Sequence, residues 1–239
     1  MRAWRAFNVS QPLSAESFCV PDRARHRTDG GLWRADAQVK PLKITGGGTA
    51  PDGISLIPLT PVPHPTTGNA TELGRYTGLG FFQILNFTGP LTAKFSSAPD
   101  VAFVAANGDK LVMTYGVVAN GAAQPGQVTL TPNADGSFSA VFVAEFNPVL
   151  AKCTGRFASV TSGSLIMIAM SSPFFIVGTN STPFTYVWQG EGVLVYGNAA
   201  GLKARPRQPD PSRVNVNALR AQLQRVAAVR QARPATRAR

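Results

Sequence analysis

The sequence predicts an all-β fold, a single antiparallel β-barrel of about eight strands over residues 39–202. Apolar runs of strand length alternate here with Gly, Pro, Asn and Asp turn signals. Two short hairpin signals, Asn107-Gly108 and residues 133–136, each lie between such runs. Many short antiparallel strands favour closure, because closure removes exposed sheet edges.

In chain order, the first strands are expected at residues 39–44, 54–59, 75–87 and 91–95. Three features between them are typical of turns: the glycines at 46–48, a proline-rich stretch, and the Thr-Gly-Asn sequence at 67–69. We therefore expect chain reversals at all three places.

The later strands are expected as two hairpins and two longer runs. Residues 101–106 and 110–117 flank Asn107-Gly108, for which a type I′ turn is expected, and residues 127–131 and 137–146 flank the second hairpin. The run at 165–170 is apolar on both faces, which favours a strand covered on both sides. The last run, 184–196, carries Gly190 and Gly192, which indicate a bend or bulge.

Charge divides the chain into three parts. The formal net charge of +11 is distributed as +4 over residues 1–43, −2 over 44–202 and +9 over 203–239. We interpret residues 1–38 as a disordered or loosely packed arm, 39–202 as the barrel, and 203–239 as a basic linker followed by a tail helix at about 214–232. The charge does not indicate that the whole protein is a basic nucleic-acid binder. We expect at most a weak electrostatic contact of the tail with nucleic acid or an anionic surface.

Several classes of site and of location are disfavoured. The N-terminus lacks the apolar run of a signal peptide and no apolar run reaches transmembrane length, so we expect a cytoplasmic protein with no transmembrane segment. His26 and His64 do not cluster with the cysteines, so no metal site is expected, and no cofactor motif is present. Cys19 and Cys153 are expected as free thiols, with a single bridge between them as the alternative.

Three segments carry a family resemblance: residues 68–77 (GNATELGRYT), 105–111 (AANGDKL) and 153–157 (CTGRF). Together they resemble a family of uncharacterised bacterial proteins, abundant in planctomycetes, that are predicted to share the eight-stranded barrel of allene oxide cyclase and dirigent proteins. Glu72 replaces the family's usual histidine, and Cys153 replaces its usual glycine. The resemblance implies a fold without implying an activity. Members of the family often carry export signals, which leaves the compartment open.

Candidate ligand-binding residues fall into an aromatic set and a polar set. In the strands expected at 137–146 and 184–196, aromatic or small residues occupy every second position, so the aromatic residues of each strand share one face. Such a face either lines an apolar ligand cavity or belongs to a filled core. The aromatic candidates are Phe138, Phe142, Phe146, Tyr186 and Trp188. The polar candidates, expected near the rim of such a cavity, are Glu72, Arg75 and Arg156. The alternative for these three is structural, as local ion pairs and loop anchors.

The leading functional hypothesis is a non-catalytic binding or scaffold barrel that holds a small apolar ligand. The alternative is an isomerase or cyclase acting on a small apolar substrate. Glu145 and Glu191 would serve it as acid–base groups if they faced inward, although outer-face positions are expected. A third hypothesis is an interaction protein that acts through its basic tail. No catalytic residue is assigned, and the sequence specifies no oligomeric state.

Overall fold

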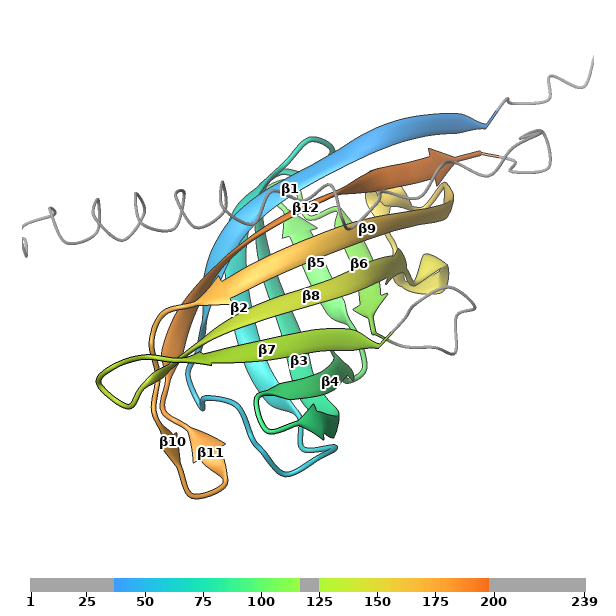
Figure 1. Cartoon of the computed structure of the whole chain (residues 1–239). Helices are drawn as coiled ribbons and strands as arrows, with labels where there is room; N and C mark the ends of the chain where they lie inside the picture. The colour runs from blue at the N-terminus through green and yellow to red at the C-terminus, as the bar shows by residue number, and fades with distance from the viewer. Residues whose placement is uncertain (1–36, 117–124, 198–239) are drawn as a thin grey trace, which may run out of the picture. The chain divides into compact units, whose positions relative to one another are not determined.

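The computed structural model describes residues 37–116 and 125–197 (Figure 1). Strands predominate in this part of the chain, and its helical structure consists of two 3₁₀ turns, η2 (Leu150–Lys152) and η3 (Gly155–Phe157). The predicted all-β class is confirmed. No helix among these residues is long and apolar enough to cross a bilayer. The expected N-terminal arm up to residue 36, and the expected linker and tail helix, lie outside the described residues.

The described strands, in chain order, are β1 (Gln38–Ala50), β2 (Val62–Ala70), β3 (Gly74–Gly89), β4 (Thr92–Ser97), β5 (Val101–Ala105), β6 (Lys110–Tyr115), β7 (Gly126–Pro132), β8 (Phe138–Pro148), β9 (Val160–Ser171), β10 (Ile176–Val177), β11 (Asn180–Ser181) and β12 (Phe184–Tyr196).

Eight of these strands close into a ring, in the order β2-β1-β12-β9-β8-β6-β5-β3, and β3 pairs back with β2 (Figure 1). We call this arrangement the strand ring. Every pairing in it is antiparallel. β3 is longer than β5, and β8 is longer than β6, so β4 pairs with the second half of β3 and β7 with the first half of β8. β10 and β11 form a separate two-stranded sheet.

The core lies inside the strand ring, because successive side chains of a strand point to opposite faces. In β8, Phe142, Ala144 and Phe146 are buried on the inner face. Glu145 alternates with them and faces outward, and Glu191 lies exposed beside Lys43, with 3.7 Å between its Oε1 and the lysine Nζ. The predicted apolar face of this strand and the outer-face positions of both glutamates agree with the structure.

The glycines at 46–48 do not form the expected turn, since β1 continues through them to Ala50. Gly46 and Gly48 face the interior, where a Cβ on Gly46 would collide with the Tyr76 hydroxyl and one on Gly48 with the Tyr186 hydroxyl. The interpretation as a turn was therefore wrong: these glycines leave room for large side chains opposite them.

No bulge forms at Gly190 and Gly192, where a bend or bulge was expected. Both residues keep their register with β1 and β9, and the irregularity of the β12–β9 pairing lies between Val195 and Tyr196. A Cβ on Gly190 would meet the side chains of Leu165 and Ile44, so this glycine also makes room for core residues.

β2 was not predicted, and the strand expected at 54–59 does not form. β2 contains Pro63 and Pro65, although a proline-rich turn was expected there. The β1–β2 pairing ends at Gly48 opposite Thr66, so both prolines lie beyond it and their missing N–H groups interrupt no ladder on that side. Residues 54–59 instead form a loop in which Ser55 makes one bridge to Asn180.

Both predicted hairpins are present, but the turn at Asn107-Gly108 is not the expected type I′ turn. Gly108 and Gly136 have φ of +89° and +80°, and the Gly108 N–H donates to the Ala105 carbonyl at 2.9 Å. Leu59 is the one non-glycine residue with positive φ in the described part of the chain, so Asn107 does not adopt the type I′ conformation. Each loop is a three-residue loop that ends in a left-handed glycine.

Candidate ligand-binding cavity

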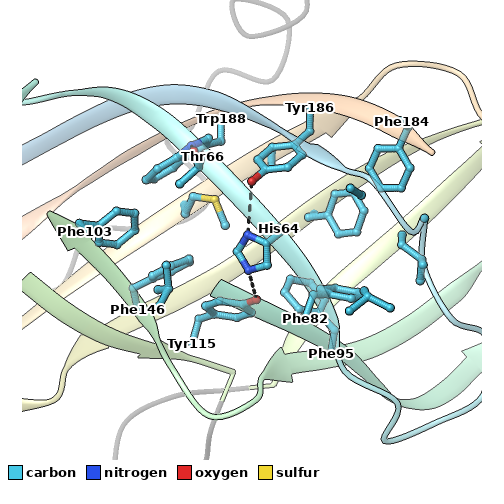
Figure 2. A pocket seen from close by; sticks show the side chains of 18 residues that line it. His64, Thr66, Phe82, Phe95, Phe103, Tyr115, Phe146, Phe184, Tyr186 and Trp188 are labelled. Carbon is cyan, nitrogen blue, oxygen red and sulfur yellow. Dashed lines mark hydrogen bonds between the residues drawn. The ribbon is translucent and has the colours of Figure 1, made fainter. Parts of the chain in front are cut away.

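The strand ring contains a cavity of about 80 Å³ (Figure 2). It lies toward the end where β1 finishes and β12 begins, since Ala50 and Phe184 both line it. A single water needs roughly 10–15 Å³ of such space, so the cavity has room for several waters or one small molecule. Most of its wall is apolar and comes from Val62, Phe82, Phe95, Val101, Phe103, Phe142, Phe146, Met167, Phe184 and Trp188.

The aromatic side chains of the wall pack against one another in edge-to-face and tilted pairs. The Phe142 ring lies edge-on to Phe82 and Phe95, with centroid distances of 5.7 and 5.8 Å. Trp188 closes the other side, 5.6 Å from the Phe103 centroid. Such pairs add to the stability gained from burial.

The sequence-predicted aromatic residues are divided by this arrangement. Phe142, Tyr186 and Trp188 line the cavity, together with Phe146. Phe138 does not line it; it lies at the start of β8, where its backbone pairs with Phe174 through bonds of 2.7 and 2.9 Å.

One polar cluster interrupts the apolar wall. Figure 2 shows the His64 imidazole between the hydroxyl groups of Tyr115 and Tyr186. Its Nε2 lies 2.8 Å from the Tyr115 Oη, and its Nδ1 lies 3.3 Å from the Tyr186 Oη. The Tyr115 hydroxyl also lies 3.1 Å from the Phe81 carbonyl oxygen, and the Tyr186 hydroxyl 3.2 Å from that of Pro65.

The strand register explains why these three side chains meet. His64 is opposite Gly80 of β3, and a Cβ on Gly80 would collide with the imidazole. Tyr186 is opposite Gly48 of β1, where a Cβ would collide with its hydroxyl. The absent side chains on the two neighbouring strands thus leave space for a histidine and a tyrosine inside the strand ring.

A second group of polar side chains lies beside this cluster, and each of them has a hydrogen-bond partner. The Trp188 Nε1–H donates to Thr66 Oγ1 at 2.9 Å, and the Thr66 hydroxyl donates to the Gly47 carbonyl at 3.1 Å. The Tyr76 hydroxyl donates to the Thr45 carbonyl at 3.1 Å. These bonds fix the Trp188 indole as one wall of the cavity.

Burial sets the charge state of the cluster. Desolvation lowers the pKa of His64 from 6.5 to about 4, so the imidazole is neutral at pH 7. Burial also raises the pKa of the Tyr115 and Tyr186 hydroxyls well above their ordinary value. These three residues are the titratable members of the cavity lining, which includes no Asp, Glu, Lys or Arg. Within residues 37–116 and 125–197, no three His, Cys, Asp or Glu side chains gather as a metal site would require.

The polar residues expected at the rim lie elsewhere. Glu72 Oε2 is 3.4 Å from Lys40 Nζ, near the start of β1, whereas the cavity lies toward the end of that strand. Arg75 is exposed near the start of β3, and neither Arg75 nor Arg156 lines the cavity.

Arg156 instead joins the three family-like segments into one clamp. Its Nε donates to Asp109 Oδ2 at 2.8 Å, and its Nη1 donates to the Glu72 carbonyl at 3.2 Å. The hydrogen bonds from Arg156 and Asn107 hold the pKa of the Asp109 carboxyl below its usual range. The adjacent Phe157 is fully buried. The contacts of Arg156 are those of a loop anchor, the structural alternative considered for it.

Residues 51–61 lie at the cavity end, where Gly53 and Ile54 line the cavity, and the β10–β11 hairpin is hydrogen-bonded to them. The Ile54 N–H donates to Ser181 Oγ at 2.8 Å, and the Leu56 N–H donates to the Thr179 carbonyl at 2.7 Å. Their outward side chains include exposed apolar residues, among them Leu59 at 65% and Val177 at 66% exposure.

Sequence reasoning missed the polar cluster because it placed His64 in a proline-rich loop. The available signal was the alternation of Val62, His64 and Thr66, which all face inward once residues 62–70 are recognised as a strand. Tyr115 was also overlooked, although it lies at the end of a strand that was predicted correctly.

Comparisons with protein-family models, curated proteins and solved structures find no match for this chain. The geometry of the cavity and of its polar cluster is therefore the basis for inferring a function.

Proposed function

We propose that this chain is a ligand-binding protein whose strand ring is a β-barrel of the allene oxide cyclase and dirigent type, and whose cavity holds one small, mainly apolar molecule. The observation that carries the proposal is the combination of an apolar cavity with one polar cluster on its wall. Binding sites for small molecules have this character: apolar surface supplies affinity, and a few polar groups fix orientation.

The family-like segments support the barrel assignment through their structural role. Residues of all three meet in the clamp around Arg156, where Asp109 and the Glu72 carbonyl accept its hydrogen bonds. If this clamp closes one end of the barrel throughout the family, the three segments must occur together in each member, whatever ligand the interior binds. The uncharacterised bacterial family thus remains our proposal for the origin of the fold.

The cavity limits the size of the ligand. Its volume of about 80 Å³ is roughly half that of an engineered 150 Å³ protein cavity that binds benzene. A ligand of a few non-hydrogen atoms fits without rearrangement, and one of about seven, such as 3-methylbutanamide, requires outward movement of the wall or of residues 51–61.

The test is saturable binding of a small neutral probe, 3-methylbutanamide, measured by saturation-transfer NMR. Ala169 lines the cavity, so Ala169→Leu adds three carbon atoms to its interior and should abolish binding. Met170 alternates with Ala169 and faces outward, so Met170→Leu is the matched control and should bind as the wild type does. Equal binding by both variants, or no saturable binding by the wild type, would refute the proposal.

A second candidate, an isomerase or cyclase, is favoured by the polar cluster of His64, Tyr115 and Tyr186, which we call the His64 cluster. A neutral imidazole between two hydroxyl groups can accept a proton and return it, as general acid–base catalysis requires. Such an enzyme would exchange the α-hydrogens of a small ketone, 3-methylbutan-2-one, with D₂O. His64→Gln would remove that activity, and exchange at the buffer rate by the wild type would argue for the binder. The third hypothesis, action through the basic tail, stays a prediction because the tail lies outside the described residues.

A further inference from the structure

The His64 cluster contains one hydrogen atom fewer than its contacts can use. Four contacts are present: two between the imidazole nitrogens and the tyrosine hydroxyls, and two between those hydroxyls and backbone carbonyls. The carbonyls of Phe81 and Pro65 are acceptors only. A neutral imidazole and two phenols supply three hydrogens, so one of the four contacts lacks a proton. An imidazolium would supply four hydrogens and satisfy every contact.

From this count, and resting on the proposed function, we propose that the cluster is a proton-accepting site for the carboxyl group of a small monocarboxylic acid. The acid's hydrocarbon part would occupy the apolar cavity. Its carboxyl group would face the Tyr186 hydroxyl, which belongs to the cavity wall.

The proton transfer can be written in full for the arrangement in which Nε2 carries the imidazole hydrogen. Nε2–H donates to Tyr115, whose hydroxyl donates to the Phe81 carbonyl, and the Tyr186 hydroxyl donates to Nδ1. The acid O–H donates to Tyr186 Oη and transfers its proton there, as the Tyr186 proton moves to Nδ1. The acid O–H bond breaks and an N–H bond forms. Tyr186 keeps one proton, and the products are a carboxylate and an imidazolium.

The surroundings of His64 favour an acid over other polar ligands. The titratable groups that face it are Tyr115 from β6 and Tyr186 from β12, while the adjacent strands β1 and β3 place Gly48 and Gly80 against the cluster. No fixed charge lies in the cavity wall to balance a cation. A carboxylate beside the cluster would supply that balance, because an opposite charge within 4–6 Å favours the charged form of a histidine. An alcohol would not give up its proton, and an ammonium ligand would repel the imidazolium.

The matched pair of 3-methylbutanoic acid and 3-methylbutanamide tests this inference on the full-length protein by isothermal titration calorimetry. At pH 7 the free acid is ionised and His64 is neutral, so acid binding should take up one proton. Titrations in phosphate and in Tris, which differ in ionisation enthalpy, measure that uptake. The Kd of the acid should rise about tenfold per pH unit between pH 6 and 8, whereas the Kd of the amide should stay constant.

Two variants distinguish loss of the proton acceptor from loss of the cavity. Glutamine can donate one hydrogen bond and accept another but takes no proton, so His64→Gln should bind the amide and lose the proton-coupled binding of the acid. Tyr186→Phe keeps the aromatic wall and removes the relay, and should weaken acid binding at least tenfold. Retained amide binding shows that each variant is folded.

The outcomes distinguish this inference from the proposed function. If acid and amide bind with the same pH dependence, if only the amide binds, or if His64→Gln binds the acid as the wild type does, the acid site is refuted and the cavity remains a binding site. If neither probe binds the wild type, both the inference and the proposed function are refuted.

Discussion

The buried neutral state of His64 predicts a specific pH dependence of stability. The pKa of this histidine is about 4 in the folded protein and 6.5 when exposed, so the unfolded chain binds more protons between these two values. The free energy of unfolding should therefore be highest above pH 6.5 and fall as the pH is lowered toward 4. At 1.36 kcal/mol per pKa unit, the loss attributable to His64 is about 3 kcal/mol.

Urea denaturation of the wild type and of His64→Gln at several pH values between 4 and 7 measures this term. Groups such as Asp109 and Asp135 also titrate in acid, but they are present in both proteins and cancel in the difference. The difference in unfolding free energy between the two proteins should change by about 3 kcal/mol over this range. His26→Gln, at the chain's other histidine, is the chemical control. Parallel pH profiles for the wild type and His64→Gln, within about 1 kcal/mol, would refute a buried neutral imidazole.

Two further predictions concern packing and backbone conformation. Phe157 has 0% exposure, so Phe157→Ala should lower the free energy of unfolding by about 3–5 kcal/mol in urea titrations. The control Leu150→Ala, at a residue 44% exposed, should lower it by less than about 1 kcal/mol. Similar values for both variants would contradict the role of Phe157 in the core. Leu59 has a φ of +60°, a conformation that costs a non-glycine residue about 1–2 kcal/mol, whereas glycine adds about 0.5–1 kcal/mol of unfolded-state entropy. Leu59→Gly should therefore leave stability unchanged or raise it by up to about 1.5 kcal/mol, and a clear loss would show that the exposed leucine makes stabilising contacts.

The strands that the sequence predicts well have an unambiguous period of two. β8 and the first half of β12 alternate aromatic with polar or aliphatic residues, and their inward faces are those expected. In β2 the alternation is obscured, because its prolines and its Gly-Asn pair are residues typical of a loop. That Pro63 and Pro65 lie beyond the β1–β2 pairing depends on where that pairing ends, which no local pattern specifies.

The candidate site is predictable in its apolar part only. Its aromatic wall follows from the strand faces, whereas the polar cluster joins residues 51 and 122 positions apart in the chain. Polar residues of the family-like segments were predicted to contact a ligand, but the structure brings these segments together in the Arg156 clamp, away from the cavity. Motif residues and cavity residues thus occupy different parts of the strand ring.

The most direct test of the binding site is a crystal structure of the full-length protein with 3-methylbutanoic acid. The account predicts ligand density inside the strand ring, with the hydrocarbon part against Phe82 and Phe142 and the carboxyl group within hydrogen-bond distance of the Tyr186 hydroxyl. Aromatic side chains that fill the interior without a void, or a ligand bound only outside the strand ring, would contradict it.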